Sequence, residues 1–252
     1  MTAALAASFA AARDAPSLAI LEGFHALKHA LRFGASVTHA VTSDPDELAA
    51  LAAALAPDVA AELTRLCLPV TPAELRALGF PRPPHTGVVA IARRPPFSPR
   101  ALLAGGGAPV VLLEDPRHLG NVGAVVRVAA AAGAAGVVTT GARDPWDPAA
   151  LRGAAGLHFA LPVGRVAGAG DGFDPAPRPL VALDPDGEPL GSAPLPAGAV
   201  LAFGTERHGL SEALLSRADA RVRIPMRPGV SSLNLATAVA AVLYATTLRS
   251  SS

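Results

Sequence analysis

The stretch that decides the fold is Ile224–Ala245, which reads I-P-M-R-P-G-V-S-S-L-N-L-A-T-A-V-A-A-V-L-Y-A. It continues an apolar strand pattern and then passes through a segment that contains Pro225, Pro228 and Gly229. Proline fixes φ and glycine admits positive φ, so this segment is expected to form a loop with one defined course. Apolar residues then recur at i, i+3 and i+4 spacing, which predicts a helix over residues 233–248. The sequence therefore predicts a strand, a rigid loop and a helix, in that order.

Polar side chains lie where this loop meets the helix. Ser231 and Ser232 are residue types that cap helix N-termini, and Asn234 is a poor helix former that we expect inside the first helical turn. A rigid loop with free backbone groups beside polar side chains suits a small-molecule site. The alternative is an ordinary strand–loop–helix connection with a capping serine, and this stretch alone does not decide between the two.

Composition restricts the class of protein. The 252 residues carry a formal net charge of +1, so a nucleic-acid partner would require arginines gathered locally. The single cysteine, Cys67, excludes an internal disulfide framework and a cysteine-cluster zinc site. The N-terminus lacks the basic segment of a signal peptide, and the longest charge-free apolar run, residues 235–248, is too short to span a bilayer. We therefore expect a cytoplasmic protein without a membrane partner.

The order of predicted elements indicates two domains. Residues 1–95 alternate short strands and helices, which is typical of a small α/β domain. The proline-rich, locally basic segment 96–108 is expected to be a linker. From residue 109 to residue 252 the strands are continuous apolar runs, which indicates a mostly parallel sheet covered on both faces.

The second domain is expected to contain six strands and four helices. The strands are expected at residues 110–113, 136–139, 159–163, 180–183, 200–203 and 220–224. The helices are expected at residues 120–132, 147–156, 211–217 and 233–248. Residues 164–178, where a further crossover helix would be expected, are too rich in glycine and proline to form a regular one.

Three segments follow predicted strands, at the edge where a parallel α/β sheet places its sites. In the first, residues 113–127, Asn121 lies at a helix start and Arg127 lies in an apolar part of that helix. An unpaired arginine is costly to bury, so a plain packing role is not expected. The alternatives are a guanidinium that reaches solvent along its aliphatic stem, or an ion pair with Glu114 or Asp115.

The second segment, residues 200–211, carries Gly204 at the end of a buried strand, followed by Glu206 and Gly209. Gly204 allows a ligand to approach the backbone closely. Glu206 is expected to orient the loop, receive an amine or pair with an arginine, and the alternative is a solvated surface carboxylate. The third segment is the stretch Ile224–Ala245.

The sequence lacks the motifs, with their characteristic residue spacing, of other common kinds of site. The seven histidines form no H-E-x-x-H motif and no close pair, so no metal site is expected. The chain contains neither a G-x-S-x-G nucleophile elbow nor a P-loop, and residues 120–123 lack the G-x-G-x-x-G pattern of nicotinamide-binding domains. These absences leave the three segments as the candidate site.

Taken together, the three segments resemble one known family. N-x-G-x-x-x-R at Asn121–Arg127, G-x-E-x-x-G at Gly204–Gly209 and I-P-M…S-L-N at Ile224–Asn234 are similar in order, spacing and strand context to the motifs of the SpoU (TrmH-type) RNA 2'-O-ribose methyltransferases, in the SPOUT superfamily. Each motif alone is weak, whereas the ordered set is specific. The resemblance covers the chain from Val110 onwards, and residues 1–95 resemble the small RNA substrate-binding domain that many members carry.

The resemblance implies a C-terminal α/β domain with a trefoil knot, S-adenosyl-L-methionine bound in that knot, and a homodimer whose sites draw on both chains. The cofactor-binding residues implied are Gly204, Ile224, Met226 and Leu233. The residues implied around the reacting ribose are Arg127, Asn121, Glu206, Ser232 and Asn234. The family's usual proposal makes Arg127 the base, but a guanidinium has a pKa above about 12. We therefore expect Arg127 to position the target and to stabilise negative charge.

The function implied is methyl transfer to a ribose 2'-hydroxyl of RNA, expected to be 23S ribosomal RNA. The alternatives are methylation of tRNA, resistance methylation of ribosomal RNA, and a catalytically silent RNA-binding or ribosome-assembly factor. RNA binding would use arginines of the loops and the linker, unless these form only a scattered solvated surface. They are Arg93, Arg94, Arg100, Arg117, Arg143, Arg152 and Arg207. An aromatic content of 4% argues against stacking on single-stranded bases as the main mode of recognition.

Overall fold

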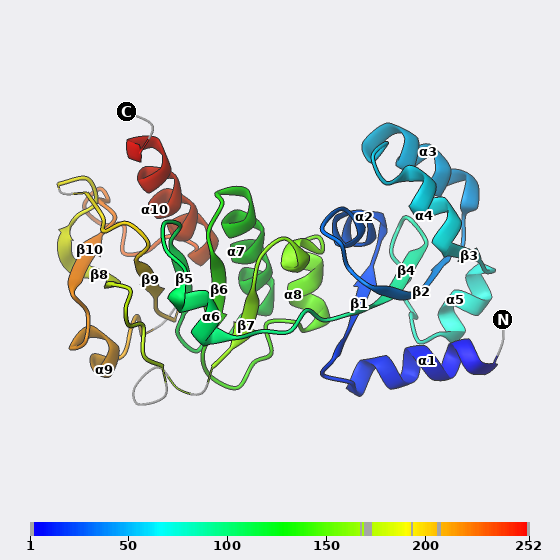
Figure 1. The fold of residues 1–252 in the computed structure, drawn as a ribbon, viewed down its shortest axis with the longest axis horizontal. Helices are drawn as coiled ribbons and strands as arrows, with labels where there is room; N and C mark the ends of the chain where they lie inside the picture. Colours follow the sequence, from blue (N-terminus) through cyan, green and yellow to red (C-terminus); the bar gives the residue numbers. More distant parts are fainter. Residues whose placement is uncertain (1–2, 167, 169–172, 193, 206–207, 251–252) are drawn as a thin grey trace. The chain divides into compact units, whose positions relative to one another are not determined.

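The computed structural model describes residues 3–166, 168, 173–192, 194–205 and 208–250. The chain forms two compact units (Figure 1), of which unit 1 comprises residues 1–96 and 146–160 and unit 2 comprises residues 97–145 and 161–252. The chain therefore leaves unit 2 after Pro145 and returns to it at Leu161. None of the helices in the described ranges combines the length and apolar character needed to cross a membrane.

Unit 1 is built on a four-stranded mixed sheet. Its elements are α1 (Ala3–Asp14), β1 (Leu18–Glu22), α2 (Phe24–Arg32), β2 (Val37–Thr42), α3 (Pro45–Leu55), α4 (Ala60–Leu66), β3 (Cys67–Pro69), α5 (Pro72–Ala77), β4 (Val88–Arg93), α8 (Pro148–Gly153) and the 3-10 helix η1 (Leu157–Phe159). The strand order is β1-β4-β2-β3, with β4 antiparallel to both of its neighbours. Phe9 of α1 and Leu75 of α5 pack with Ile20 and Ile91 of the sheet, so apolar side chains on these helices account for one layer of the core.

The segment 146–160 is fixed within unit 1 by polar contacts that are remote in sequence. Arg152 Nη1 donates to Glu22 Oε1 at 2.6 Å, and these groups form an ion pair. His29 Nδ1 lies 2.8 Å from the carbonyl oxygen of Ala155, to which it donates because a carbonyl can only accept. These contacts join α8 to β1 and α2.

Close packing supports the same segment. Gly156 has φ +77°, and a Cβ at this position would collide with the backbone of Ala26, so only glycine fits here. The ring of Trp146 meets that of Phe159 edge-on, with 5.3 Å between centroids. Phe159 instead ends the 3-10 helix η1, and β7 begins only at Val163, so the strand expected over residues 159–163 is wrong except at its last residue.

Unit 2 contains a six-stranded sheet in which every neighbouring pair is parallel, with the order β10-β8-β9-β5-β6-β7. Its elements are α6 (Pro99–Ala104), β5 (Val110–Leu113), α7 (Leu119–Ala131), β6 (Gly136–Thr139), β7 (Val163–Arg165), β8 (Leu180–Pro189), β9 (Val200–Phe203), α9 (Glu212–Leu215), β10 (Ala220–Arg223) and α10 (Leu235–Ser250). β5, β6 and β9 are buried along their whole length, as continuous apolar runs predict. The predicted α/β fold with a mostly parallel sheet is confirmed.

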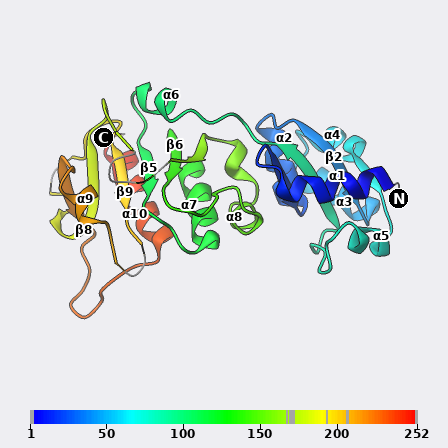
Figure 2. The same cartoon turned by 90° about the horizontal axis from the view of Figure 1, so that it is seen from below.

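Helices cover both faces of this sheet. Leu102 of α6 and Leu214 of α9 belong to a buried cluster with Val110, Leu112 and Ala202 of the central strands. α7 and α10 pack against each other (Figure 1), and Figure 2 shows them on the side of the strands opposite α6. The parallel sheet is therefore packed between two layers of helices.

The topology of unit 2 defines one edge for a site. All six strands run in the same direction, so their carboxyl ends meet at the same edge of the sheet. β6 and β7 lie on one side of β5, whereas β9, β8 and β10 lie on the other. In open α/β sheets, ligands bind beyond the carboxyl ends of the strands where the strand order reverses in this way. The loop that joins β10 to α10, residues 224–234, extends from this edge (Figure 2).

Part of the expected linker 96–108 is folded. It contains α6, which begins after the N-cap Ser98, and Leu102 and Leu103 of this helix are buried in unit 2. Arg178, which is 7% exposed, donates hydrogen bonds to four carbonyl oxygens at and near the end of α6. They belong to Leu102, Leu103, Ala108 and Gly198. No helix is present in the described part of residues 164–178, as expected from their composition.

Candidate functional site

A cavity of about 180 Å³ lies at the carboxyl edge of the parallel sheet of unit 2. Its walls come from the middle of β8, from the ends of β9 and β10, from the loop 224–234 and from the start of α10. Predicted residues from two of the three sequence segments line it: Gly204, Ile224, Met226, Ser232 and Leu233. The fold therefore brings together segments that are remote in the sequence, although the roles of these residues remain predictions.

The β9–α9 loop (residues 204–210) requires glycine at position 204, where its first residue lies against its last two. A Cβ at Gly204 would collide with the backbone of Gly209 and Leu210. Thr205 and Gly209 exchange two backbone hydrogen bonds, of 3.0 and 3.1 Å, which hold the described part of this loop in a narrow turn. Gly204, Thr205 and Gly209 all line the cavity, so backbone groups form much of this wall.

Two charged side chains at the cavity were not among the predicted site residues. Asp184, at the turn within β8, has a side chain that is 10% exposed, and its carboxylate lies 3.5 Å from Arg221 Nη1. Arg223 at the end of β10 donates to the carbonyl oxygen of Gly187 at 2.7 Å. The run D-P-D-G at residues 184–187 after an apolar strand was the available signal for this part of the site. Within the described residues, no group of three His, Cys, Asp or Glu side chains is arranged to hold a metal ion.

Asn234 joins two of the predicted motifs. Its Nδ2 donates to Oδ1 of Asn121 at 3.2 Å, so α7 and the start of α10 are connected by a side-chain hydrogen bond. Its Oδ1 accepts from the backbone N–H of Ala236 at 2.9 Å, and its carbonyl accepts the first helical bond, from Ala238. Asn234 is therefore the N-cap of α10. The expectation that it lies inside the first turn is wrong, and Ser232 is two residues too early to cap this helix.

Arg127 lies on α7, six residues beyond Asn121, and its side chain is exposed. Six residues correspond to about 9 Å along a helix and to about 120° around it, so the two side chains leave α7 in different directions. Among the residues that the structure describes, the Arg127 guanidinium has no hydrogen bond or ion pair. The alternative ion pairs do not form, because Glu114 accepts hydrogen bonds from Ser211 and Asp115 pairs with Arg117. Within that part of the chain, the charge of Arg127 is therefore not paired.

Glu206 and Arg207 lie outside the described residues. The remaining arginines predicted for RNA binding differ in their surroundings. Arg94 donates to the carbonyl oxygen of Leu18 and lies over the ring of Trp146. Arg117 and Arg152 are engaged in ion pairs while staying largely exposed.

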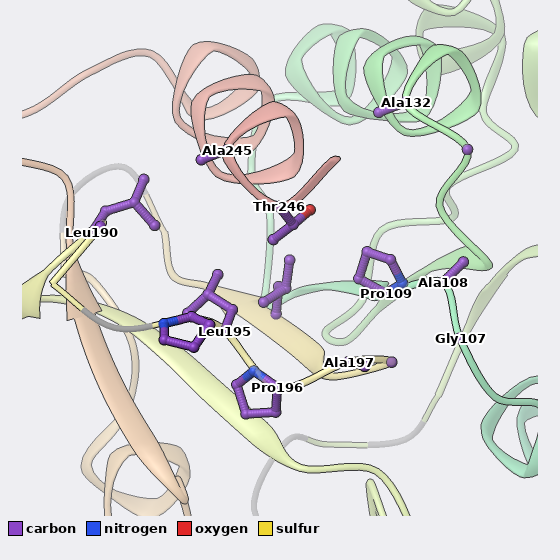
Figure 3. A pocket seen from close by; sticks show the side chains of 15 residues that line it. Gly107, Ala108, Pro109, Ala132, Leu190, Leu195, Pro196, Ala197, Ala245 and Thr246 are labelled. Carbon is purple, nitrogen blue, oxygen red and sulfur yellow. The ribbon is translucent and has the colours of Figure 1, made fainter. Parts of the chain in front are cut away.

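A larger cavity, of about 530 Å³, lies elsewhere in unit 2 and contains none of the predicted site residues (Figure 3). Pro109, Leu195, Pro196 and other apolar or glycine residues line it, and Thr246 of α10 is the polar side chain that Figure 3 labels there. Thr246 Oγ1 donates to the carbonyl oxygen of Leu243 in its own helix. Two cavities are larger than the first, this one and another of about 670 Å³. We assign the site to the cavity of about 180 Å³ because it is lined by the motif residues.

Known proteins are similar to this chain in both sequence and fold. The model of the SpoU rRNA Methylase family matches residues 108–244, more than half of the chain. A 23S rRNA (uridine(2479)-2'-O)-methyltransferase of Streptomyces viridochromogenes is 36% identical over 144 residues, which cover 53% of this chain and 50% of that protein. A 23S rRNA (adenosine(1067)-2'-O)-methyltransferase of Streptomyces laurentii is 34% identical over 62% of this chain and 60% of its own length. The chain thus spans less than two thirds of the length of these relatives.

Solved structures match over nearly the full length. The SpoU methyltransferase AviRb of Streptomyces viridochromogenes, in complex with AdoMet, has a TM-score of 0.79 and 25% identity, and the match covers 100% of this chain and 99% of that one. An AdoMet-bound rRNA methyltransferase of Sinorhizobium meliloti has a TM-score of 0.73 and 26% identity, covering 97% of this chain and 93% of its own.

Proposed function

The chain belongs to the SpoU rRNA methylase family, and from this premise we propose that it transfers a methyl group from S-adenosyl-L-methionine to a ribose 2'-hydroxyl of RNA. The observation that carries the proposal is the meeting of all three motifs at one sheet edge. Gly204, Ile224 and Ser232 line one cavity, and the hydrogen bond between Asn121 and Asn234 connects the first motif to the third.

The cavity suits S-adenosylmethionine in its chemistry. Gly204, Ile224, Met226 and Leu233 offer backbone groups and apolar side chains to the ligand. Asp184 adds a carboxylate of opposite charge to the cofactor's sulfonium and ammonium groups. A volume of about 180 Å³ is below the roughly 300–1,000 Å³ of pockets for drug-sized ligands. The cavity therefore encloses one portion of the cofactor, and the exposed residues of the loop 224–234 would cover more of it.

The exposed cation of Arg127 fits a target with phosphate groups. A guanidinium binds phosphate through paired N–H donors, and it is too weak a base to remove the hydroxyl proton. We assign to Arg127 the positioning of the RNA backbone and the stabilisation of the developing alkoxide. Asn121 and Asn234 together fix the geometry of the neighbouring backbone, and Ser232 at the cavity offers a hydroxyl toward the ribose. Glu206 remains a predicted member of this group. Bound S-adenosylmethionine supplies the methyl group.

We propose 23S ribosomal RNA as the substrate, and hence the cytoplasm as the place of action, because the relatives from Streptomyces viridochromogenes and Streptomyces laurentii are 23S rRNA 2'-O-methyltransferases. Unit 1 is proposed to bind this RNA. Its exposed arginines, together with those of the loops of unit 2, supply phosphate contacts without a large net charge.

A homodimer is also proposed. The loop 224–234 exposes Met226, Val230 and Leu233, at 38%, 45% and 41%, and α10 exposes Tyr244 at 44%. Apolar side chains gathered beside a binding site are typical of a surface that a partner covers. Light scattering should give twice the 25.2 kDa of one chain at micromolar concentration. A mass of one chain would contradict this proposal.

The trefoil knot stays a proposal too. It is supported by the convergence of the turn within β8, the β9–α9 loop and the loop 224–234 around one cavity. Joining the two termini covalently and unfolding the closed chain would test it, because a true knot persists as a topological constraint that a linear unknotted chain lacks.

The test of function is transfer of tritium from S-[methyl-³H]adenosylmethionine to RNA. Purified protein is incubated with total RNA from a strain that lacks its gene, and the RNA is hydrolysed with alkali. We expect label in dinucleotides that resist alkali, because a 2'-O-methyl group blocks cleavage at that ribose. Comparison of alkali-resistant sites in 23S ribosomal RNA from deletion and parent strains identifies the nucleotide. Cofactor binding without incorporation into any RNA would favour the silent assembly factor, and label in tRNA would identify the alternative substrate.

A further inference from the structure

We propose that Glu114 is a positioning residue that holds both ends of the β9–α9 loop and thereby shapes the cofactor cavity. Glu114 follows β5 directly and is 9% exposed, in a position that belongs to none of the three motifs. This inference rests on the proposed function for the identity of the ligand. The contacts that suggest it do not depend on that identity.

The first contact is at the start of the loop. The backbone N–H of Glu114 donates to the carbonyl oxygen of Phe203, the last residue of β9, at 2.9 Å. It continues the parallel pairing of β5 with β9 by one residue beyond the end of β5. Gly204 therefore leaves the sheet from a fixed point.

The second contact is at the end of the loop, and it involves the side chain. Oε2 of Glu114 accepts from the backbone N–H of Ser211 at 2.7 Å, and Oε1 accepts from the Ser211 hydroxyl at 2.6 Å. The same hydroxyl oxygen accepts from the backbone N–H of Leu214 and so caps α9. One carboxylate thus fixes the position where the loop ends and the orientation of the next helix.

The two donors of Ser211 match the two oxygens of a carboxylate. Both oxygens accept, whereas a glutamine would present one acceptor oxygen and one NH₂ group to the same two donors. Hydrogen bonds to a carboxylate are shorter and stronger than those to a neutral amide, which agrees with the 2.6 and 2.7 Å distances. Within the described part of the chain, no Arg, Lys or His forms an ion pair with Glu114, so Ser211 is the main partner of its charge.

The consequence concerns the cavity wall. Gly204, Thr205 and Gly209 line the cavity, and all three lie between Phe203 and Ser211. A loop whose two ends are bound to one residue keeps a constant distance between those ends. We infer that Glu114 lowers the free energy needed to order this part of the cavity wall around the ligand, without contacting the ligand itself.

The test uses Glu114→Gln and the milder Ser211→Ala in the full chain. Ser211→Ala removes the hydroxyl but leaves the backbone N–H. The matched control is Glu74→Gln in unit 1, where the glutamate likewise accepts from a backbone N–H and a hydroxyl, both of Thr71, in the capping box of α5. The readouts are the S-adenosylmethionine dissociation constant by calorimetry and hydrogen exchange of peptides covering residues 203–211. Steady-state kinetics on the RNA that the wild type methylates gives KM and kcat separately.

We expect Glu114→Gln to raise the dissociation constant about tenfold, the effect of losing one charge-assisted hydrogen bond. KM for the cofactor should rise in parallel, while kcat at saturating cofactor stays near that of the wild type. Exchange in the loop should become faster. Ser211→Ala should show a smaller change in the same direction, the double variant should lose less than the sum of the two single effects, and Glu74→Gln should leave all of these readouts unchanged.

An unchanged dissociation constant together with unchanged exchange in folded Glu114→Gln would overturn the inference. So would additive effects of the two substitutions, since these would show that Glu114 and Ser211 act independently. If Glu114→Gln does not fold, Ser211→Ala decides the matter by the same two readouts. If the wild type does not bind S-adenosylmethionine, the proposed function fails, and loop exchange then tests the role of Glu114 by itself.

Discussion

Asn234 and Asn121 are 113 residues apart in the chain, and the side-chain amide of the first donates to that of the second at 3.2 Å. Asn234 has two separate tasks here, because its oxygen caps α10 while its NH₂ group binds Asn121. Either task alone would be met by a simpler residue. Asparagine is required because it carries an acceptor and a donor on one short side chain.

The two tasks of Asn234 can be separated by substitution. Asn234→Ser keeps a good N-cap but loses the donor to Asn121, so its free energy of unfolding should stay within about 0.5 kcal/mol of the wild type. Asn234→Ala loses the cap as well and should cost about 1 kcal/mol more. Methyl transfer should fall at least about tenfold in both variants, since this is the effect of one lost hydrogen bond in the site. Full activity of Asn234→Ser would contradict a role for the bond to Asn121.

Arg127→Ala should reduce kcat by about a hundredfold or more, because it removes a cation proposed to stabilise the developing alkoxide. The side chain is exposed, so thermal stability and cofactor affinity should not change. Arg165→Ala is the control, since Arg165 is not among the arginines predicted to bind RNA and already donates to the carbonyls of Gly141 and Ala142. A gel-shift measurement distinguishes the two proposed tasks: an equal loss of RNA affinity would leave only positioning.

Arg178→Ala should lower the free energy of unfolding of unit 2 by about 3 kcal/mol or more, as measured by urea denaturation. The substitution leaves buried carbonyl oxygens without their charged donor. Arg178→Lys should recover little, because one ammonium group cannot reach four separate carbonyls. The matched control is Arg165→Ala, which removes exposed bonds to the carbonyls of Gly141 and Ala142 and should cost less than about 1 kcal/mol. If both variants lost the same free energy of unfolding, burial would not explain the stabilising effect of the Arg178 hydrogen bonds.

His29 should make unit 1 sensitive to mild acid. Burial lowers the pKa of His29; the bond to the Ala155 carbonyl opposes this, and the charges of Lys28 and Arg32 add to it. The folded state therefore favours the neutral ring. Its contribution to stability is present above the ordinary value of 6.5 and is lost as pH falls through the lowered pKa. The loss should stay below about 1 kcal/mol, since the half-exposed ring is screened.

The measurement for His29 is the melting temperature between about pH 7 and about pH 5. His29→Asn keeps a donor for Ala155 but does not titrate, so it should show a weaker acid dependence than the wild type. His85→Asn, at an exposed position, serves as the control and should follow the wild type. If the melting temperatures of the wild type and of His29→Asn fell in parallel with pH, His29 would not be the source of the acid sensitivity.

The centre of the unit 2 sheet could be predicted because β5, β6 and β9 are continuous apolar runs that are buried along their whole length. The start of α10 could not be located in the same way. Serine and asparagine both cap helices, so only the observed bond from Ala236 to Asn234 decides between residues 231, 232 and 234. Residues of the predicted motifs line the cavity. Asp184 was missed because it lies where the pairing of β8 with β10 is interrupted before it resumes farther along.

Long-range contacts account for the other differences. Leu102 and Leu103 lie in a short segment whose composition predicts a linker. Their burial depends on Arg178 and on the strands that they cover. The turn at Phe159 depends on the ring of Trp146. Neither partner can be identified from spacing within the segment itself.

Residues 146–160 belong to unit 1 although the chain around them builds unit 2, and this has a consequence during synthesis. When residue 96 has left the ribosome, Glu22 and His29 still lack the Arg152 and Ala155 partners that bind them in the finished protein. Unit 1 therefore cannot complete its packing until residue 160 has been made, when four of the six strands of the unit 2 sheet, β7 to β10, are still to be synthesised. A fragment cut after residue 96 would be an unfinished fold rather than an isolated domain, whereas residues 1–160 contain every part of unit 1.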